Sequence, residues 1–494
     1  LAQLVVTTTD GRQTVIATDT SWRMMADGPI QTNNEFDGER YDATREMPGW
    51  SLAGYDDSRW RKAERVKTPA PVVRAQINPN IEVMDSVAPR SIYRTADGRY
   101  IMDMGQNMVG WLRIRLRGDE GDTLRLRFAE RMKDSDSLFM LNLRTALVTD
   151  TYVSAHKAAT WEPRFTIHGF RYVELSGFKR QPSLADIQGR VVYDRMATTG
   201  TFDTSDPTIN AVYHCAVWGI RGNYRGIPTD CPQRDERLGW TGDISVFAST
   251  ACFNFNMNRF LRKWLIDVKA QQTKDGGIPV VVPRVKHFGG TKITAGWSDC
   301  VFLVPWALYQ NSGDKTILEK FYPMMKRYLS GVEKKAAAFS SGEDRYIWSH
   351  GFSYGDWCAP NENQKQWMAK KKWISTAYYA NDCALASKIA TILGFEEEAK
   401  AFQEKRKCIE NAYRNVFTDK KGTLKNEFQT AYVCPLYFGM VSGEERKKYA
   451  ENLLRLVKEA DNHLSTGFLG TPYLLFALSD NGYINEAYDL LLQD

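Results

Sequence analysis

The densest group of reactive side chains in this sequence lies between residues 230 and 243. These fourteen residues hold four carboxylates, two arginines and a tryptophan, namely Asp230, Arg234, Asp235, Glu236, Arg237, Trp240 and Asp243. Pro228 and Pro232 oppose a helix at its start, and Gly239 and Gly242 indicate a flexible or tightly turned second part. The pattern predicts a loop that crowds charge, because a solvated helix would show i,i+4 alternation of charge.

Crowded carboxyl groups suit glycoside hydrolysis. One of two carboxyl groups must be protonated near neutral pH so that it can donate to the leaving oxygen. Neighbouring carboxylates raise the pKa of a carboxyl group and adjacent arginines lower it, so one acid can stay protonated while the others accept hydrogen bonds from sugar hydroxyls. A structural ion-pair network beneath a helix end is the alternative, and the spacing alone leaves it open.

Two later stretches pair a tryptophan with an aspartate. Trp297 stands near Asp299, and Asp356 precedes Trp357. An aromatic face beside a hydrogen-bond acceptor suits a pyranose, which has an apolar face and hydroxyl edges. For each pair taken singly, the alternative is a packed tryptophan beside a helix-capping aspartate. Three such clusters in one half of the chain favour a sugar site.

The elements that must position these loops differ between the two halves of the chain. Residues 1–180 show strand patterns, such as the strict alternation of 111–117 and a hairpin signal at Asp10-Gly11. Short strands separated by turns predict β-sandwiches. A break at 67–73, with two prolines, divides this half into modules at 1–66 and 67–185.

The chain follows the helical period from about Pro207. Apolar stripes predict helices at 315–335, 375–393, 395–416 and 444–458. Helices joined by loops that carry Trp and Asp indicate a helical toroid, in which the loops at one end line a cleft. We therefore expect a linker at 186–206 and a helical domain at 207–494.

Composition excludes several classes of protein. Of 494 residues, 43% are hydrophobic and 25% are charged, which is typical of globular proteins and unlike a disordered chain, a collagen-like fibre or a coiled coil. No run of 18 apolar residues occurs, so no membrane span is expected. The net charge of +6 is scattered, which argues against a nucleic-acid partner. A periplasmic or secreted location agrees with these features, and a cytoplasmic one stays open.

Cofactor signals are sparse, and we expect no cofactor. The eight cysteines form no CxxC pair and all lie beyond residue 214, so mostly buried free thiols are expected, with one or two disulfides left open. The sequence has no Walker loop, GxSxG or strand-coupled GxGxxG. Asp37, Glu39 and Asp42 are candidates for calcium in a β module, with a turn-and-cap role as the simpler interpretation.

The stretch 230–243 resembles the bacterial α-L-rhamnosidases, which are inverting glycoside hydrolases with an (α/α)6 catalytic barrel. Further similar motifs extend the resemblance over essentially the whole chain, at 37–43, 48–50, 56–60, 103–107, 110–111, 162–172, 296–299 and 355–357. The resemblance implies a multidomain β + α fold, in which N-terminal β-sandwich modules precede an (α/α)6 toroid catalytic domain. It also implies hydrolysis of terminal non-reducing α-L-rhamnose from rhamnosides or polysaccharides.

Matched by position, Glu236 is implied to be the general acid that protonates the glycosidic oxygen. The residues implied to hold rhamnose hydroxyls and to tune this acid are Asp230, Arg234 and Asp243. Those implied to wall the pocket, with the rhamnose methyl group on apolar surface, are Trp240, Trp297 and Trp357. Further candidates for the pocket are Asp299 and Asp356.

The sequence departs from the family at the general base, which in the family is a Glu in a Trp-Glu-Arg-Trp-like stretch. No such stretch occurs here, and residues 465–472 resemble the landmark that precedes it. We therefore expect the base beyond Asp494, and an internal fragment in which the first sandwich and the barrel are incomplete. Another exo-glycosidase of this barrel class and a non-catalytic carbohydrate-binding protein stay open as alternatives, as does a homo-oligomeric state.

Overall fold

The computed structural model describes residues 2–67, 75–155, 158–286 and 290–493. The chain divides into two compact units, and each is described by itself. The β unit comprises residues 1–76, 82–193 and 232–235, and the helical unit comprises 77–81, 194–231 and 236–494. The expected module break at 67–73 lies, apart from Lys67, outside the described residues.

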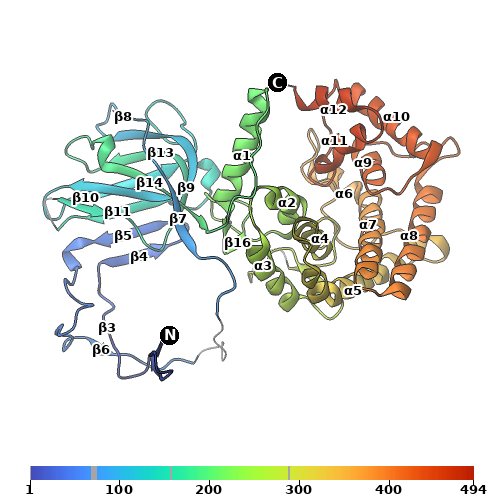
Figure 1. Ribbon diagram of the computed structural model, residues 1–494. Coiled ribbons are helices and arrows are strands. Elements are labelled where there is room, and N and C mark those ends of the chain that lie inside the picture. Colours follow the sequence, from blue (N-terminus) through green and yellow to red (C-terminus); the bar gives the residue numbers. More distant parts are fainter. Residues whose placement is uncertain (1, 68–74, 156–157, 287–289, 494) are drawn as a thin grey trace. The chain divides into compact units, whose positions relative to one another are not determined.

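A ten-stranded sheet forms the centre of the β unit (Figure 1). Its main order is β4-β5-β11-β10-β13-β9-β14-β7, and β8 and β12 also pair with β9. The bounds are β4 Ile30–Asn34, β5 Gly38–Asp42, β7 Ile81–Val87, β8 Ser91–Arg94, β9 Tyr100–Arg117, β10 Thr123–Ala129, β11 Thr149–Val153, β12 Ala158–Trp161, β13 His168–Ser176 and β14 Ile187–Asp194. The long β9 pairs with β8, β12, β13 and β14.

Alternating residues explain which face of the sheet is buried. In β10, Leu124, Leu126 and Phe128 are buried, whereas Arg125 and Arg127 are exposed. Successive side chains of a strand point to opposite faces, so this alternation directs the leucines into the core and the arginines to solvent. The predicted strand at 111–117 is confirmed as the second part of β9.

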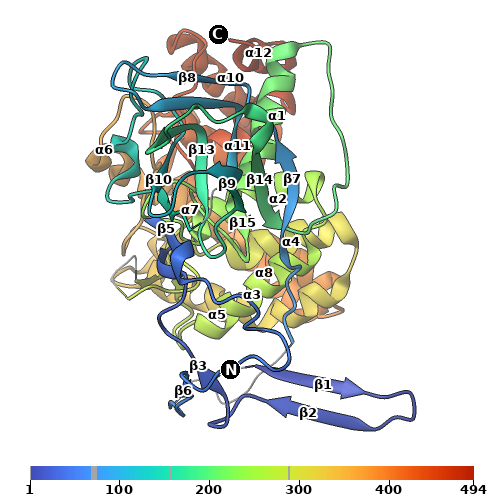
Figure 2. The same ribbon diagram turned by 90° about the vertical axis from the view of Figure 1, so that its left-hand side faces the viewer.

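Four short strands of the N-terminal part pair outside the large sheet. β1 Gln3–Thr7 and β2 Gln13–Ala17 form an antiparallel hairpin, drawn as a separate ribbon in Figure 2. β3 Arg23–Met24 pairs with β6 Arg61–Lys62. Gly11 has a φ of +84°, a left-handed conformation that glycine adopts without steric cost, so the predicted Asp10-Gly11 turn is confirmed.

Two predicted domain limits need correction. β5 pairs with β11, so residues 30–42 belong to the large sheet and not to a separate module that ends at 66. β14 pairs with β9, so the expected linker at 186–206 begins inside the sheet. Both predictions failed because strand pairing depends on distant partners, which turn and proline signals do not report.

Twelve α-helices form most of the described helical unit (Figure 1). They are α1 Pro207–Asn223, α2 Thr241–Asn254, α3 Asn258–Gln271, α4 Cys300–Ser312, α5 Lys315–Ala337, α6 Gln364–Ala369, α7 Lys371–Ile392, α8 Glu396–Phe417, α9 Gln429–Tyr437, α10 Gly443–Glu459, α11 Thr471–Ser479 and α12 Ile484–Leu491. Two-residue strands pair between them, β15 Tyr224–Arg225 with β16 Ile227–Pro228 and β17 Ile278–Pro279 with β18 Thr291–Lys292. The four predicted helices are confirmed as α5, α7, α8 and α10.

Helix starts and packing follow local chemistry. Asp206 caps α1 by accepting from the N–H groups of Thr208 and Ile209, and Pro207 occupies the first turn. Neighbouring helices pack in pairs, such as α7 with α8, α9 with α10 and α11 with α12. The apolar stripe of α5 is buried. This confirms that the helical period of apolar residues correctly predicted this helix.

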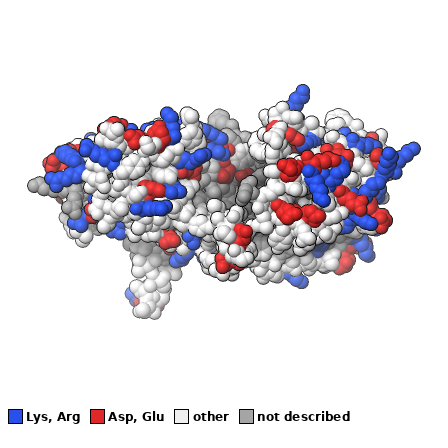
Figure 3. All heavy atoms as spheres, turned by 90° about the horizontal axis from the view of Figure 1, so that it is seen from above, with Lys and Arg blue, Asp and Glu red and all other residues white. Residues whose placement is uncertain are grey.

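Surface and thiol features agree with the composition. No helix in the described ranges is long and apolar enough to cross a bilayer. On the face drawn in Figure 3, basic and acidic side chains are interspersed on the surface that the figure describes. All eight cysteines are free thiols, and five of them are buried, which agrees with the expected mostly buried free thiols.

Candidate active site

The loop after β16 folds back on itself and brings acidic groups together. A carboxylate oxygen of Asp230, the Sγ of Cys231 and a carboxylate oxygen of Glu236 all lie within 4.8 Å of one another. The N–H of Leu238 donates to Asp230 Oδ1 at 2.8 Å, and the N–H of Asp230 donates to the Leu238 carbonyl at 3.0 Å. Arg237 has a φ of +51° and its N–H donates to Cys231 Sγ, so a left-handed turn closes the loop.

Trp240 orients Glu236. The indole Nε1–H of Trp240 donates to Glu236 Oε1 at 2.9 Å, and only 8% of the Glu236 surface is exposed. A carboxyl group held by one oxygen in a nearly water-free place keeps a defined direction. That is what a general acid needs in order to meet one leaving oxygen.

The end of the acidic loop is pinned to residues 280–282. The N–H of Val282 donates to the Gly239 carbonyl at 2.8 Å, and the N–H of Thr241 donates to the Val280 carbonyl at 2.9 Å. A Cβ on Gly239 would lie 2.1 Å from the Val282 carbonyl oxygen, so only glycine permits this approach. The loop is therefore tightly fixed at this end.

The predicted loop ends earlier than expected. α2 begins at Thr241, so Gly242 and Asp243 lie in its first turn. Gly242 serves close packing here, because a Cβ on it would come within 2.6 Å of the Trp297 ring. A carboxylate in the first turn of a helix is favoured by the positive end of the helix dipole, which explains why Asp243 is compatible with the helix start.

Tyr354 lies among the three predicted tryptophans. Its ring centroid is 4.1 Å from that of Trp297, 5.6 Å from that of Trp357 and 6.4 Å from that of Trp240. The structure thus brings together three tryptophans that come from separate loops. Tyr354 itself was not predicted as a site residue, although it directly precedes the Gly355–Trp357 motif. Its position in that aromatic stretch was the available signal.

A cavity of about 280 Å³ lies beside this group in the helical unit. Its lining includes Asp230, Asp243, Tyr224 and Phe468. Phe468 also packs against Trp297, at 5.7 Å between ring centroids. The volume is slightly below the ~300 Å³ at which ligand pockets begin. Glu236 and the three predicted tryptophans are not part of its lining.

Asp299 and Asp356 differ from their expected role at an open sugar edge. Both side chains are fully buried. Asp299 accepts from the N–H of Gly296 at 2.5 Å and from the hydroxyl of Tyr328 at 3.2 Å. Asp356 accepts from Thr430 Oγ1 at 2.7 Å, and burial raises its pKa to about 6. Both carboxyl groups therefore accept hydrogen bonds from other residues of the protein, close in sequence to Trp297 and Trp357.

Arg234 and Asp235 belong to the segment 232–235, which groups with the β unit. Asp235 accepts from the N–H of Thr145 at 3.3 Å and from the Thr145 hydroxyl. The hydrogen bond from the Thr145 hydroxyl is the largest of the interactions that lower the pKa of Asp235. Asp235 is therefore an ionised acceptor for a β-unit loop.

The three calcium candidates make separate contacts in the β unit. Asp42 accepts from the N–H of Thr44 at 3.0 Å and caps the short 3₁₀ helix Ala43–Arg45, which confirms a cap role. Asp37 accepts from the N–H of Leu147 at 3.3 Å. Glu39 is buried and accepts from Asn33 Nδ2 at 2.9 Å, and burial raises its pKa.

Family comparisons agree with this architecture. Residues 197–494 match the bacterial α-L-rhamnosidase six-hairpin glycosidase domain, 93–193 match the bacterial α-L-rhamnosidase concanavalin-like domain, and 1–85 match the α-L-rhamnosidase N-terminal domain. The match over residues 197–494 places the helical unit in the six-hairpin glycosidase class. Within that class, the chain belongs to the bacterial α-L-rhamnosidase family.

Named relatives extend over the whole chain. It is 39% identical to an α-L-rhamnosidase of Streptomyces avermitilis and 38% identical to one of Formosa agariphila, covering 100% of this chain and 46% and 53% of those proteins. The chain therefore spans about half the length of the curated relatives it matches.

Solved structures confirm the predicted fold class. The crystal structure of the Streptomyces avermitilis α-L-rhamnosidase complexed with L-rhamnose matches with a TM-score of 0.92, covering 99% of this chain and 46% of that one at 39% identity. The native α-L-rhamnosidase of Aspergillus terreus matches with a TM-score of 0.93 at 34% identity, covering 99% and 57% of the two chains.

Proposed function

We propose that the protein containing this chain hydrolyses terminal non-reducing α-L-rhamnose from rhamnosides or rhamnose-bearing polysaccharides. The observation that carries the proposal is the buried Glu236, oriented by Trp240 and adjacent to Asp230, which lines a cavity of about 280 Å³. The 39%-identical Streptomyces avermitilis enzyme supports the sugar, because its crystal structure is of a complex with L-rhamnose.

In this mechanism Glu236 is the general acid. Its carboxyl proton passes to the glycosidic oxygen as the bond from that oxygen to C1 breaks, and the aglycone leaves as an alcohol. Water attacks C1 from the opposite ring face and gives its proton to a second carboxylate, so the product is β-rhamnose. Such an inverting pair is separated by roughly 6.5–9.5 Å, which leaves room for the water.

The remaining residues divide by chemistry. Asp230 and Asp243 line the cavity and accept hydrogen bonds from rhamnose hydroxyls. Trp240, Trp297 and Trp357 supply apolar faces for the ring and its methyl group. Asp299 and Asp356 support the loops that carry two of these tryptophans, since both carboxyl groups are buried.

The experiment follows hydrolysis of an aryl α-L-rhamnoside by the complete enzyme in an NMR time course. β-Rhamnose should form first, and α-rhamnose as the first product would contradict inversion. Glu236→Gln should lower kcat by about 10²–10⁴-fold, as expected for loss of general acid catalysis. Glu404→Gln, at a solvated carboxylate paired with Lys407, is the matched control and should behave as wild type. Unimpaired activity of Glu236→Gln would disprove the assignment of the acid.

A panel of aryl glycosides tests the sugar. Preference for a glucoside or glucuronide would indicate a different exo-glycosidase of this class. Rhamnose binding without turnover by the full-length protein would indicate a carbohydrate-binding protein. Either result would replace the proposed function.

A further inference from the structure

A second depression, of about 500 Å³, lies on the face of the large sheet in the β unit. It is formed over β4, β5, β11, β10 and β13, five strands that are adjacent in the sheet. Its lining includes Arg40, Arg125 and Arg127, all exposed at the surface. None of the catalytic candidates belongs to this lining.

The strand register places a row of guanidinium and hydroxyl groups on this face. Arg40 pairs with Thr32 on one side and Thr151 on the other. Arg125 pairs with Thr151 and with Ser176. Side chains directly opposite each other on neighbouring strands point to the same face. Two arginines therefore alternate with three hydroxyl side chains across five strands.

A second row lies beside the first. Arg127 pairs with Thr149 on β11 and with Glu174 on β13. Residues two apart in a strand share a face, so Arg127 projects on the same side as Arg125. We call Arg40, Arg125 and Arg127 the arginine face.

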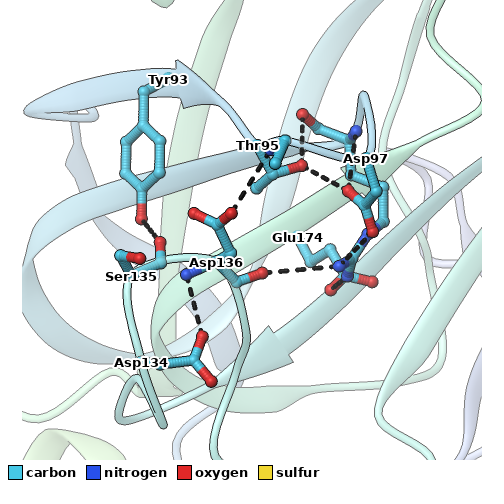
Figure 4. A network of polar contacts seen from close by, with 9 residues as sticks. Tyr93, Thr95, Asp97, Asp134, Ser135, Asp136 and Glu174 are labelled. Carbon is cyan, nitrogen blue, oxygen red and sulfur yellow. Dashed lines mark hydrogen bonds and ion pairs between the residues drawn. The ribbon is translucent and has the colours of Figure 1, made fainter.

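The arginine face presents three guanidinium groups that are not directly paired within the described part of the chain. Within that part, the side chains of Arg40, Arg125 and Arg127 make no ion pair or hydrogen bond. Glu174, the acid nearest in register, is bound instead by Arg99, which also binds Asp97, and Figure 4 shows Glu174 and Asp97 in this network.

The other acids of the lining are also engaged. Asp37 accepts from the N–H of Leu147, and Glu39 accepts from Asn33 and from the N–H of Arg164. Gly38 stands between them, and a Cβ there would lie 2.3 Å from the Thr149 carbonyl oxygen. This position therefore excludes a side chain, because the backbone of β11 packs directly against it.

We propose that the arginine face binds an anionic saccharide chain through carboxylate or sulfate groups. A guanidinium matches such planar or multidentate anions with paired N–H donors, and the threonine and serine hydroxyls suit sugar hydroxyls. Arg40 and Arg125 stand two strands apart, about 10 Å at the usual strand spacing, so one chain can present anions to both. The described lining has no aromatic side chain for stacking bases, which disfavours a nucleic acid.

The test is binding of a fluorescently labelled oligogalacturonate to the purified chain, measured by anisotropy at low and high salt. Wild type should bind, with affinity falling as salt rises. Arg125→Gln/Arg127→Gln should bind about tenfold or more weakly, because two charge-assisted contacts are lost. Arg40→Gln is a second, single variant in case the double variant unfolds. Arg94→Gln, at an exposed arginine of β8 outside the lining, is the matched control and should bind as wild type.

Three further probes distinguish the outcomes. Labelled dextran sulfate replaces carboxylate by sulfate, and binding of either anionic chain that depends on the arginine face supports the proposal. Equal binding of a neutral malto-oligosaccharide would overturn it, as would no binding of either anionic chain. Tighter, arginine-dependent binding of single-stranded DNA would overturn it in favour of a nucleic-acid ligand. None of these readouts involves hydrolysis, so failure here leaves the proposed rhamnosidase activity untouched.

Discussion

Asp299, at the start of α4, and Asp382 of α7 are neighbouring carboxyl groups in the core of the helical unit. Both side chains are completely buried. Burial raises the pKa of Asp299, and burial together with the nearby Asp299 charge raises the pKa of Asp382 well above its ordinary value. Two carboxyl groups can share a hydrogen bond only if one of them carries a proton.

The proton belongs on Asp382. Asp299 already accepts from the Gly296 N–H and the Tyr328 hydroxyl, whereas as a carboxylate Asp382 would have no donor among the described residues. A protonated Asp382 donates to Asp299, and Asp299 holds the turn at Gly296 that precedes Trp297. The pair therefore connects α7 to a wall of the proposed rhamnose site.

Asp382→Asn should make stability less sensitive to pH. A raised folded pKa means that the folded state binds more protons between the unfolded pKa near 3.8 and the folded value, so the free energy of unfolding of wild type falls as pH rises through that window. An amide donates to Asp299 without binding a proton. The free energy of unfolding of the variant minus that of wild type should therefore increase by up to about 1.4 kcal/mol for each unit by which the pH is raised. Urea unfolding from pH 4 to 8 measures this difference.

Asp299→Asn is the matched comparison for that experiment. Its single carbonyl oxygen cannot accept all the hydrogen bonds that the carboxylate accepts, so we expect a loss of about 1–3 kcal/mol. Equal behaviour of the two variants, or a pH-independent difference for Asp382→Asn, would contradict a proton located on Asp382.

Gly242→Ala should destabilise the protein by about 1–3 kcal/mol, because the new Cβ would lie 2.6 Å from the Trp297 ring and overpack it. Thermal unfolding gives the loss, and tryptophan fluorescence reports displacement of the ring. Gly219→Ala is the control glycine, since it lies within α1 with nothing within 4 Å of an added Cβ. That change should stabilise by about 0.5–1 kcal/mol. Similar losses at both positions would rule out the Trp297 contact as the cause.

Trp240→Phe should lower kcat of the complete enzyme by about tenfold and change KM little. The phenyl ring keeps most of the apolar wall but removes the indole N–H that donates to Glu236 Oε1. Steady-state kinetics on an aryl rhamnoside gives the two constants. A higher KM with unchanged kcat would mean that Trp240 contributes to binding and does not orient the acid.

Tyr354→Ala should destabilise the helical unit by about 2–3 kcal/mol, because its half-buried ring contacts Trp240, Trp297 and Trp357. Tyr354→Phe keeps these ring contacts and should stay within about 0.5 kcal/mol of wild type. Urea unfolding compares the two variants. A large loss in Tyr354→Phe would assign the stabilisation to the hydroxyl group instead of the ring.

Local patterns predicted the helices well and the strand partners poorly. The apolar stripe of α5 repeats at the helical period within one segment, so it is visible without any knowledge of neighbours. β4 and β5, by contrast, join the sheet through β11, which lies far away in the sequence. The domain limit at residue 66 was wrong for that reason.

The site divides in the same way. Asp230, Glu236 and Trp240 lie within one loop, so their residue types and spacing already indicated acid chemistry, and the structure brings them together. Tyr354 was missed because nothing in its own stretch shows that three tryptophans from different loops surround it.

The sequence by itself determined the chemistry of the acidic loop, the helical segments and the resemblance to rhamnosidases, because each depends on residues close together in the chain. Only the tertiary structure decided that Asp299 is buried near Asp382, and that Arg40, two strands away, shares a sheet face with Arg125 and Arg127. Burial and strand register arise from packing between distant segments. Burial decides whether a carboxyl group keeps a proton in the core, and strand register decides whether arginines lie on the same face. Spacing along the chain reveals neither.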